Sequence, residues 1–213
     1  MNCKELIKSF DRKSFCEDVN LHIHTTCSDG TSSVKEILEQ AKKLHFKYIS
    51  ITDHNTFNAY KEINLQDETF VISGIEFDCW LGTVFFHLLA YGVDINCEAL
   101  KPFLAQTKKE TEADFLRLFS KRNVKDLISA IHEAGGIAVL AHPACYWCIS
   151  MDRFVKKLIS LGLDGIETYY PYNRLRGVVK FHSRKTAEKL ADKYGLIKTG
   201  GTDCHKKLEK MKL

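Results

Sequence analysis

The sequence of 213 residues contains no long hydrophobic run. It nowhere reaches the roughly 18 uninterrupted apolar residues of a membrane-spanning helix. Its N-terminus, MNCKELIKSFDRK, alternates charged and apolar residues and lacks the apolar core of a signal peptide. The sequence also has no internal repeat, low-complexity tract or linker. We therefore expect a cytoplasmic protein that folds as a single domain over residues 1–213.

A strong excess of one charge is also absent. The formal net charge is +4, which permits an anionic substrate but does not by itself indicate nucleic-acid binding. The eight cysteines are scattered, and Cys27 and Cys204 lie in the sequence among the candidate ligands described below, so the cysteines are expected as thiols and not as a disulfide framework. With 45% hydrophobic and 27% charged residues, the chain can bury a substantial core.

Short apolar runs alternate with segments of helical periodicity. We predict strands at 21–24, 48–52, 70–80, 83–91, 137–141, 165–170 and 196–199, with helices following at 34–44, 127–131, 154–161 and 178–194. The 70–80 and 83–91 strands flank Leu81-Gly82, which indicates a tight turn between neighbours. Residues 97–122 are polar and lysine-rich, and we expect them to form a short helical insertion outside this rhythm. Repeated strand–helix units predict a mainly parallel sheet, closed or nearly closed into a barrel.

Nine histidine and carboxylate side chains lie at or beside the ends of these runs. They are His22, His24, Asp29, His54, Glu76, His87, His142, Asp203 and His205. In a parallel barrel the C-terminal ends of the strands open on one rim, so residues that follow different strands converge. We expect His24, His54, Glu76, His142 and Asp203 at such ends. His22 and His24, two positions apart on a strand, share one face.

This set of side chains is typical of a hydrolytic metal centre. Neutral imidazole suits divalent transition metals, and carboxylates can bridge two ions, which together favour zinc, manganese or iron over calcium. Such ions lower the pKa of bound water and stabilise an in-line displacement at phosphorus, so the chemistry needs no serine or cysteine nucleophile. One histidine would be uninformative, but nine candidate ligands at strand ends are hard to produce by chance. We predict a metal-dependent hydrolase.

Six strings of the sequence resemble the successive motifs of the PHP (polymerase and histidinol phosphatase) superfamily. They are LHIHTTCSDGT, ISITDHNT, SGIEF, FFHLLAYGVD, GGIAVLAHP and TGGTDCH, and they run from about Asn20 to His205. They resemble most closely its small stand-alone metal-dependent phosphoesterases, which include nucleoside 3′,5′-bisphosphate phosphatases and 5′-to-3′ exoribonucleases on short RNA. The resemblance implies a distorted seven-stranded βα barrel with a trinuclear centre.

The resemblance also distributes the ligands among three divalent ions, which would be manganese, zinc or iron. The first ion would be held by His22, His24, Glu76 and Asp203, the second by Asp29, His54 and His205, and the third by His87 and His142 with Glu76 as the bridge. A hydroxide bridging the metals would attack phosphorus, and the catalytic residues would be Glu76, Asp203 and His205.

Two stretches depart from the phosphoesterase pattern and bear on the substrate. Ala144 and Cys145 follow His-Pro where that branch usually has Gly-Arg, and an arginine there would suit a phosphate. Tyr170 lies in a segment where the branch tends to have histidines. Arg174 and Arg176 follow a predicted strand end, so we expect them, with Tyr170, to contact the substrate. Ordinary surface cations and a packed tyrosine are the alternatives.

The sequence therefore predicts a phosphoesterase that hydrolyses a phosphate ester of a nucleotide or short oligonucleotide. A histidinol-phosphate phosphatase is an alternative with similar metal chemistry, and amide or ester hydrolysis by the same centre is a third possibility. A hypothesis of a different kind is a non-catalytic PHP module that binds a partner. All nine ligand positions are filled in this sequence, which argues against the loss of catalysis. We expect the protein to bind a small phosphorylated substrate. We expect it neither to associate with a membrane nor to need an obligatory protein partner.

Overall fold

The computed structural model describes residues 2–172 and 182–213 as an α/β protein. The strands are β1 Val19–Ile23, β2 Tyr48–Ile51, β3 Gly74–Leu81, β4 Val84–Tyr91, β5 Ile137–Leu140, β6 Gly165–Tyr169 and β7 Ile197–Gly200. The α-helices are α1 Cys3–Lys8, α2 Arg12–Glu17, α3 Val34–Lys43, α4 Lys109–Glu112, α5 Asp114–Arg117, α6 Val124–Glu133, α7 Met151–Ile159 and α8 Arg184–Tyr194, and the 3₁₀ helices are η1 Asn58–Lys61, η2 Glu98–Phe103 and η3 Pro143–Cys145. All seven predicted strands are present, so the predicted α/β class is confirmed.

The strands form two sheets that isolated bridges join. One sheet has the order β3-β4-β5-β6-β7 and the other is the pair β1-β2. The pairs β1-β2, β5-β6 and β6-β7 are parallel, whereas β3-β4 and β4-β5 are antiparallel. Single parallel bridges connect Ile23 with Cys204, and Ile49 with Val71. The predicted seven-stranded barrel is therefore not confirmed, because two of its joints are single bridges and not continuous ladders.

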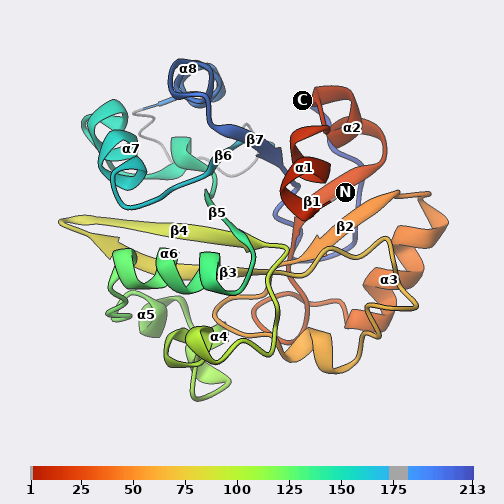
Figure 1. Cartoon of the computed structure of the whole chain (residues 1–213). Coiled ribbons are helices and arrows are strands. Elements are labelled where there is room, and N and C mark those ends of the chain that lie inside the picture. The colour runs from red at the N-terminus through yellow and green to blue at the C-terminus, as the bar shows by residue number, and fades with distance from the viewer. Residues whose placement is uncertain (1, 173–181) are drawn as a thin grey trace.

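The hairpin of β3 and β4 matches its prediction. The two strands pair in register from Gly74 opposite Tyr91 to Leu81 opposite Val84. Gly82 in the turn has φ +62°, a left-handed conformation that glycine adopts without steric cost. β3 and β4 are the longest strands, and Figure 1 shows them side by side with α6 beneath.

Two helices that the sequence analysis did not predict cover one side of the strands. Figure 1 shows α1 and α2 beside the strands, and α1 packs against β7 and α2 against β1. Ile7 and Phe15 of these helices are fully buried in a cluster with Leu21 and Tyr91. Each helix has six residues, too few for a helical periodicity to stand out in the sequence.

Two other segments differ from their predictions. Residues 97–122 are helical as expected, but as the three short elements η2, α4 and α5. They fold over the loop after β1 and over β3, because Thr111 Oγ1 donates to the Cys27 carbonyl (3.3 Å) and Ser120 Oγ to the Asp78 carbonyl (3.0 Å). The predicted helix at 178–194 begins only at Arg184 within the described residues. None of the helices in the described ranges is long and apolar enough to span a membrane.

One side chain adds hydrogen bonds to the isolated bridges that connect the β2 and β3 segments. The buried hydroxyl of Tyr60, on η1, donates to the Ile51 carbonyl (2.7 Å), lies 3.3 Å from the Ile72 carbonyl, and accepts from the Gly74 N–H (2.8 Å). These backbone groups have no ladder between β2 and β3 to pair them. Gly74 is required for this close approach, because a Cβ atom there would lie 2.2 Å from Ser50 Oγ.

We expect the substitution Tyr60→Phe to lower the free energy of unfolding by about 1–3 kcal/mol, because it leaves buried backbone groups without a partner. Urea unfolding followed by circular dichroism measures this loss. The control is Tyr194→Phe, which removes a hydroxyl that donates to the half-exposed Asp152 (3.0 Å). Equal losses in the two variants would contradict a bridging role for Tyr60.

Candidate metal centre

All nine predicted ligands come together on one side of the strands. They are reached from β1 (His22, His24 and the following Asp29), the end of β2 (His54), β3 (Glu76), β4 (His87), the end of β5 (His142) and the segment after β7 (Asp203, His205). The closeness of these side chains follows from the parallel pairs, whose C-terminal ends share an edge.

Glu76 was expected at the C-terminal end of a strand. In the structure it is the third residue of β3. An isolated parallel bridge places it opposite His54, which follows β2. β3 begins late relative to β2 and continues past the rim as one arm of the hairpin with β4. A residue early in β3 therefore reaches the same level as residues that follow the other strands.

The Glu76 carboxylate lies at the centre of the cluster and is only 1% exposed. Its Oε2 lies 3.1 Å from Nε2 of both His22 and His24, and its Oε1 lies 3.0 Å from His87 Nδ1 and 3.1 Å from His142 Nε2. One carboxylate thus contacts four imidazoles: His22 and His24 from β1 and its end, His87 from β4 and His142 from the end of β5.

The donor atoms fall into four overlapping groups, in each of which they lie within 4.8 Å of one another. The groups are His22, His24, Glu76 and Asp203; His24, Asp29, His54 and His205; Glu76, His87 and His142; and His54, Asp78 and His87. The first and third match the ligand sets that the resemblance implies, and the second adds His24 to the implied set. The fourth contains Asp78, which the sequence analysis missed.

The donor set fits divalent metal ions. Both ring nitrogens of His24 are buried without a hydrogen-bond partner, although Nε2 lies 3.1 Å from oxygens of Glu76 and Asp203. His142 Nδ1 is likewise buried without such a partner. A metal ion satisfies buried nitrogens that face carboxylates but are not aligned for a hydrogen bond, and imidazole with carboxylate is a common ligand set for transition metals.

Asp78 stands behind two of the histidines. It lies two residues after Glu76, so both side chains project from one face of β3. Its Oδ1 lies 3.4 Å from His54 Nδ1 and 3.2 Å from His87 Nε2, while the other nitrogen of each ring faces Glu76. Asn55 donates a short hydrogen bond to its other oxygen. The signal in the sequence was the alternation of Glu76 and Asp78 within a strand.

Glu167 on β6 has the same relation to two other histidines. Its Oε1 lies 3.0 Å from His22 Nδ1, and its Oε2 accepts the backbone N–H of His142 (2.8 Å). Carboxylates in this position fix the orientation of a metal-binding imidazole and raise its basicity. Sequence reasoning missed Glu167, although a charged residue inside a fully buried strand is a recognisable signal.

Asp53, which follows β2, stabilises the loop after β1. It accepts hydrogen bonds from the Thr25 amide (2.7 Å), the Thr25 hydroxyl (2.7 Å) and the Ser28 hydroxyl (2.6 Å). These bonds fix the loop that precedes Asp29. Gly30 closes the same loop, where a Cβ atom would lie 2.5 Å from the His24 carbonyl oxygen.

The predicted substrate contacts have mixed outcomes. Tyr170 is 2% exposed and donates a hydrogen bond from its hydroxyl to Asp203 Oδ2 (2.7 Å), so its ring presents no open surface for stacking. Arg174 and Arg176 lie outside the described residues. Tyr170 thus orients a carboxylate of the cluster in the structure.

Burial and charge act against each other in this cluster. Burial lowers the pKa of His24, but the adjacent carboxylates of Asp203 and Glu76, each 3.1 Å from Nε2, more than offset it and raise the pKa to about 10. For Glu76, burial raises the pKa, and the surrounding imidazoles, His22 first, bring the pKa well below its usual range. At neutral pH the carboxylates are therefore ionised, and protons on imidazoles balance part of their charge.

A cavity of about 420 Å³ opens onto the cluster, a volume suited to a small-molecule ligand. It is lined by Asp29, His54, Glu76, His87, Glu112, Arg117, His142, Asp203 and His205. Two of these, Glu112 and Arg117, come from the 97–122 segment and were not predicted as site residues.

Comparisons with known proteins agree with this arrangement. The profile of the family described as the PHP domain matches residues 20–188. The phosphoribosyl 1,2-cyclic phosphate 1,2-diphosphodiesterase of Eggerthella lenta is 25% identical over 88% of this chain and 94% of its own length. The 5′-3′ exoribonuclease Rnm of Salmonella typhimurium is 28% identical over 68% of this chain, which spans 55% of that relative.

Solved structures show the same fold. A protein from Bifidobacterium adolescentis described as a metal-dependent phosphoesterase has a TM-score of 0.72 at 21% identity, covering 92% of this chain and 91% of its own. An amidohydrolase from Chromobacterium violaceum, solved with sulfate and no metal, has a TM-score of 0.73 at 18% identity, covering 91% and 89%.

We expect Mn²⁺ binding at pH 7 to release at least one proton per chain, because His24 with a pKa of about 10 is protonated there and must lose its proton to bind a metal. Mn²⁺ affinity should accordingly rise with pH. Calorimetric titrations at pH 7 in two buffers of different ionisation enthalpy count the protons. Identical heats in both buffers would contradict the prediction.

We expect Glu167→Gln to weaken Mn²⁺ binding about 10- to 100-fold, because the amide no longer supports the His22 ring as a carboxylate does. The same calorimetric titration measures the affinity. The matched control is Glu98→Gln, whose carboxylate is 81% exposed. An unchanged affinity in the Glu167 variant would remove that residue from the metal centre.

Proposed function

This chain belongs to the PHP domain family, and we propose that it is a metal-dependent phosphoesterase acting on a ribose-linked phosphate ester of a nucleotide or short oligonucleotide. The observation that carries the proposal is the convergence of nine candidate ligand side chains in one cluster, onto which a cavity opens. Seven of them lie within the matched residues 20–188. Asp203 and His205 lie beyond that segment, and the bridge between Ile23 and Cys204 brings them to the site.

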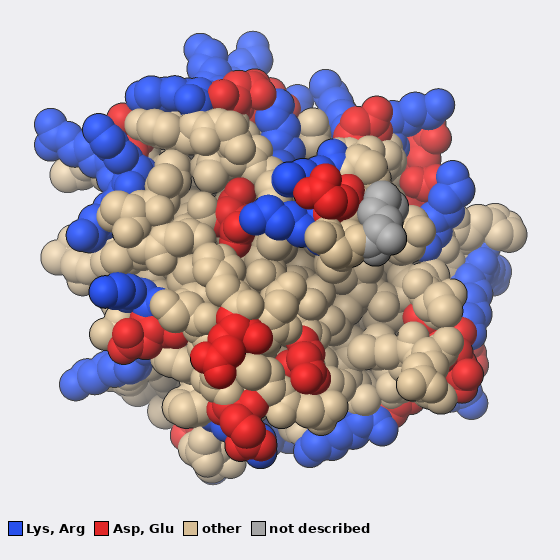
Figure 2. All heavy atoms as spheres, viewed as in Figure 1, with Lys and Arg blue, Asp and Glu red and all other residues tan. Residues whose placement is uncertain are grey.

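The relatives support this reaction and substrate class. One is named for a phosphoribosyl cyclic phosphate and the other for the exonucleolytic cleavage of RNA, so both names describe a phosphodiester attached to ribose. On the face seen in Figure 2, basic and acidic side chains are interspersed and form no continuous basic strip. Among the described residues on that face, no basic strip of the kind that binds a long nucleic-acid chain is seen.

Bound metal ions would supply Lewis-acid activation of water and stabilise the negative charge that develops at phosphorus. We propose three ions per chain. The four groups of donor atoms share His24, His54, Glu76 and His87, so there are fewer independent ion sites than groups. Nitrogen and carboxylate oxygen in this proportion favour manganese, zinc or iron.

The protein contributes positioning and exclusion of water. Glu76 and Asp203 both face the His24 ring, and Tyr170 donates to the second oxygen of Asp203. The His205 side chain is 38% exposed, which places it at the mouth of the site, where it can contact the substrate. The cavity that opens onto these buried groups would be the route for the substrate.

We expect Glu76→Gln and Asp203→Asn each to lower phosphate-ester hydrolysis by at least about 10²-fold, since each variant removes a charge from the centre without changing side-chain volume. The assay measures phosphate or nucleoside release from 2′,3′- and 3′,5′-cyclic nucleotides, a nucleoside 3′,5′-bisphosphate, a short RNA and histidinol phosphate. Circular dichroism confirms folding, and Glu98→Gln is the exposed control.

Retained activity in either variant would overturn the assignment of these residues. Turnover of histidinol phosphate alone would replace the proposed substrate class with the amino-alcohol phosphate. Turnover of no phosphate ester by the metal-loaded wild-type protein would overturn the proposed function.

A further inference from the structure

A buried arginine faces the metal centre from outside the strands. Arg117 is the last residue of α5, in the 97–122 segment, and is 7% exposed. Its Nη1 lies 2.9 Å from Asp29 Oδ2, and its Nε lies 4.0 Å from Asp78 Oδ1. Arginine is seldom buried to this degree without a specific charge partner, and here that partner is a predicted metal ligand.

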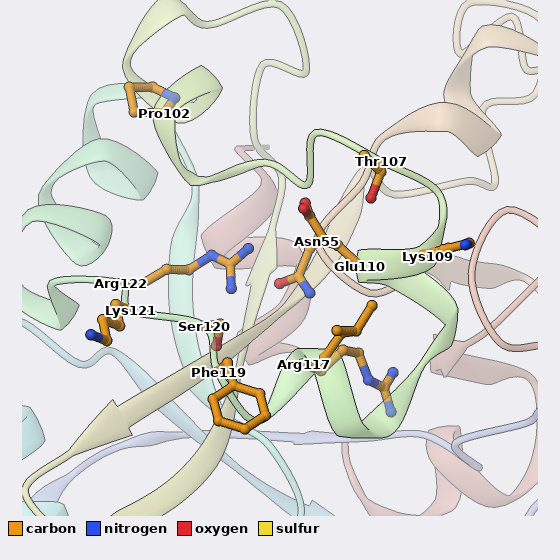
Figure 3. A pocket seen from close by; sticks show the side chains of 11 residues that line it. Asn55, Pro102, Thr107, Lys109, Glu110, Arg117, Phe119, Ser120, Lys121 and Arg122 are labelled. Carbon is orange, nitrogen blue, oxygen red and sulfur yellow. The ribbon is translucent and has the colours of Figure 1, made fainter.

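Arg117 lines two neighbouring cavities. One is the 420 Å³ cavity at the metal centre, and the other, of about 480 Å³, is lined by side chains that include Asn55, Phe119 and Arg122. Figure 3 shows the second cavity, with Arg117 and Phe119 on one short stretch of chain and Asn55 near them. The guanidinium therefore stands where a ligand at the metal centre would extend into the adjoining cavity.

Once metal ions are bound, the charges around Arg117 favour a further anion beside its guanidinium. Asp29 also faces three imidazoles, with His24, His54 and His205 at 3.5, 3.6 and 3.4 Å, so a metal ion in that group would share its negative charge with the guanidinium. With the charge of Asp29 divided between the metal ion and the guanidinium, a further anion beside both cations is electrostatically favourable. A guanidinium also matches the oxygens of a phosphate in a bidentate manner.

We propose that Arg117 binds the phosphate group of the substrate at the metal centre, an inference that rests on the proposed function. Among the described residues that line the 420 Å³ cavity, Arg117 is the only lysine or arginine. The 97–122 segment therefore has a second role: it carries the cation that recognises the phosphate while the strands carry the metal ligands.

Calorimetric titration of the Mn²⁺-loaded protein with inorganic phosphate tests the proposal. We expect Arg117→Met to weaken phosphate binding about 10- to 100-fold, the loss of a hydrogen-bonded charge, and Arg117→Lys to bind with intermediate affinity. The matched control is Lys121→Met. Lys121 is an exposed cation of the same segment that does not line the 420 Å³ cavity, so this variant should bind phosphate as the wild type does.

Metal content, measured by mass spectrometry on each variant, separates binding from a purely structural role. If Arg117 only anchored Asp29, Arg117→Met would lose metal while the protein that stays loaded kept its phosphate affinity, and that result would overturn the proposal. Wild-type phosphate affinity at full metal content would overturn it as well. For phosphate-ester turnover, we expect KM to rise more than kcat falls.

A measurement on the wild-type chain covers the case in which Arg117→Met does not fold. Phenylglyoxal modifies arginines, and peptide mass spectrometry reports its reaction with Arg117. We expect saturating phosphate to protect Arg117 in the Mn²⁺-loaded protein, and absence of protection would contradict the proposal. If the wild type hydrolyses no ester but Arg117 still governs phosphate binding, only the proposed function fails. If it hydrolyses esters and Arg117→Met keeps its affinity, only the role of Arg117 fails.

Discussion

The rest of the site depends on one buried carboxylate. Glu76 is enclosed by His22, His24, His87 and His142, each with a ring nitrogen within 3.1 Å of a carboxylate oxygen. An ionised carboxyl group without water is very unfavourable unless charge and hydrogen bonds compensate it. Four imidazoles from the segments of three strands, β1, β4 and β5, must therefore meet at one point, and this requirement constrains the level at which each strand ends.

The scaffold meets that constraint through joints and supports that lie outside regular ladders. Tyr60 replaces missing sheet hydrogen bonds between β2 and β3, so that β3 can start late and place Glu76 opposite His54. Asp78 and Glu167 then hold the outer faces of the imidazoles. Rigid support of this kind presents ligands in place, which a metal centre needs because a displaced ligand weakens metal binding.

Local features of the sequence were sufficient for much of the fold. The turn at Gly82 and the start of α3, where Ser33 and Glu36 form a capping box, depend on neighbours only a few residues away. The predicted turn is present. The closed barrel was not confirmed. Closure depends on contacts between distant segments, such as the Ile23–Cys204 bridge between residues 181 positions apart, and no local pattern in the sequence reports such contacts. Helices α1 and α2 are stabilised by burial of Ile7 and Phe15, which no local pattern reveals.

The sequence by itself determined the chemistry of the centre, because the types of the nine ligands and their places beside apolar runs follow from residue identity and strand periodicity alone. Only the tertiary structure decided which groups surround them. Glu167 and Arg117 lie far along the chain from the side chains they contact, His22 and Asp29, so their roles arise from packing and not from spacing. Direct ligands leave a pattern in the sequence, whereas the residues that orient them or neutralise charge need only be near in space.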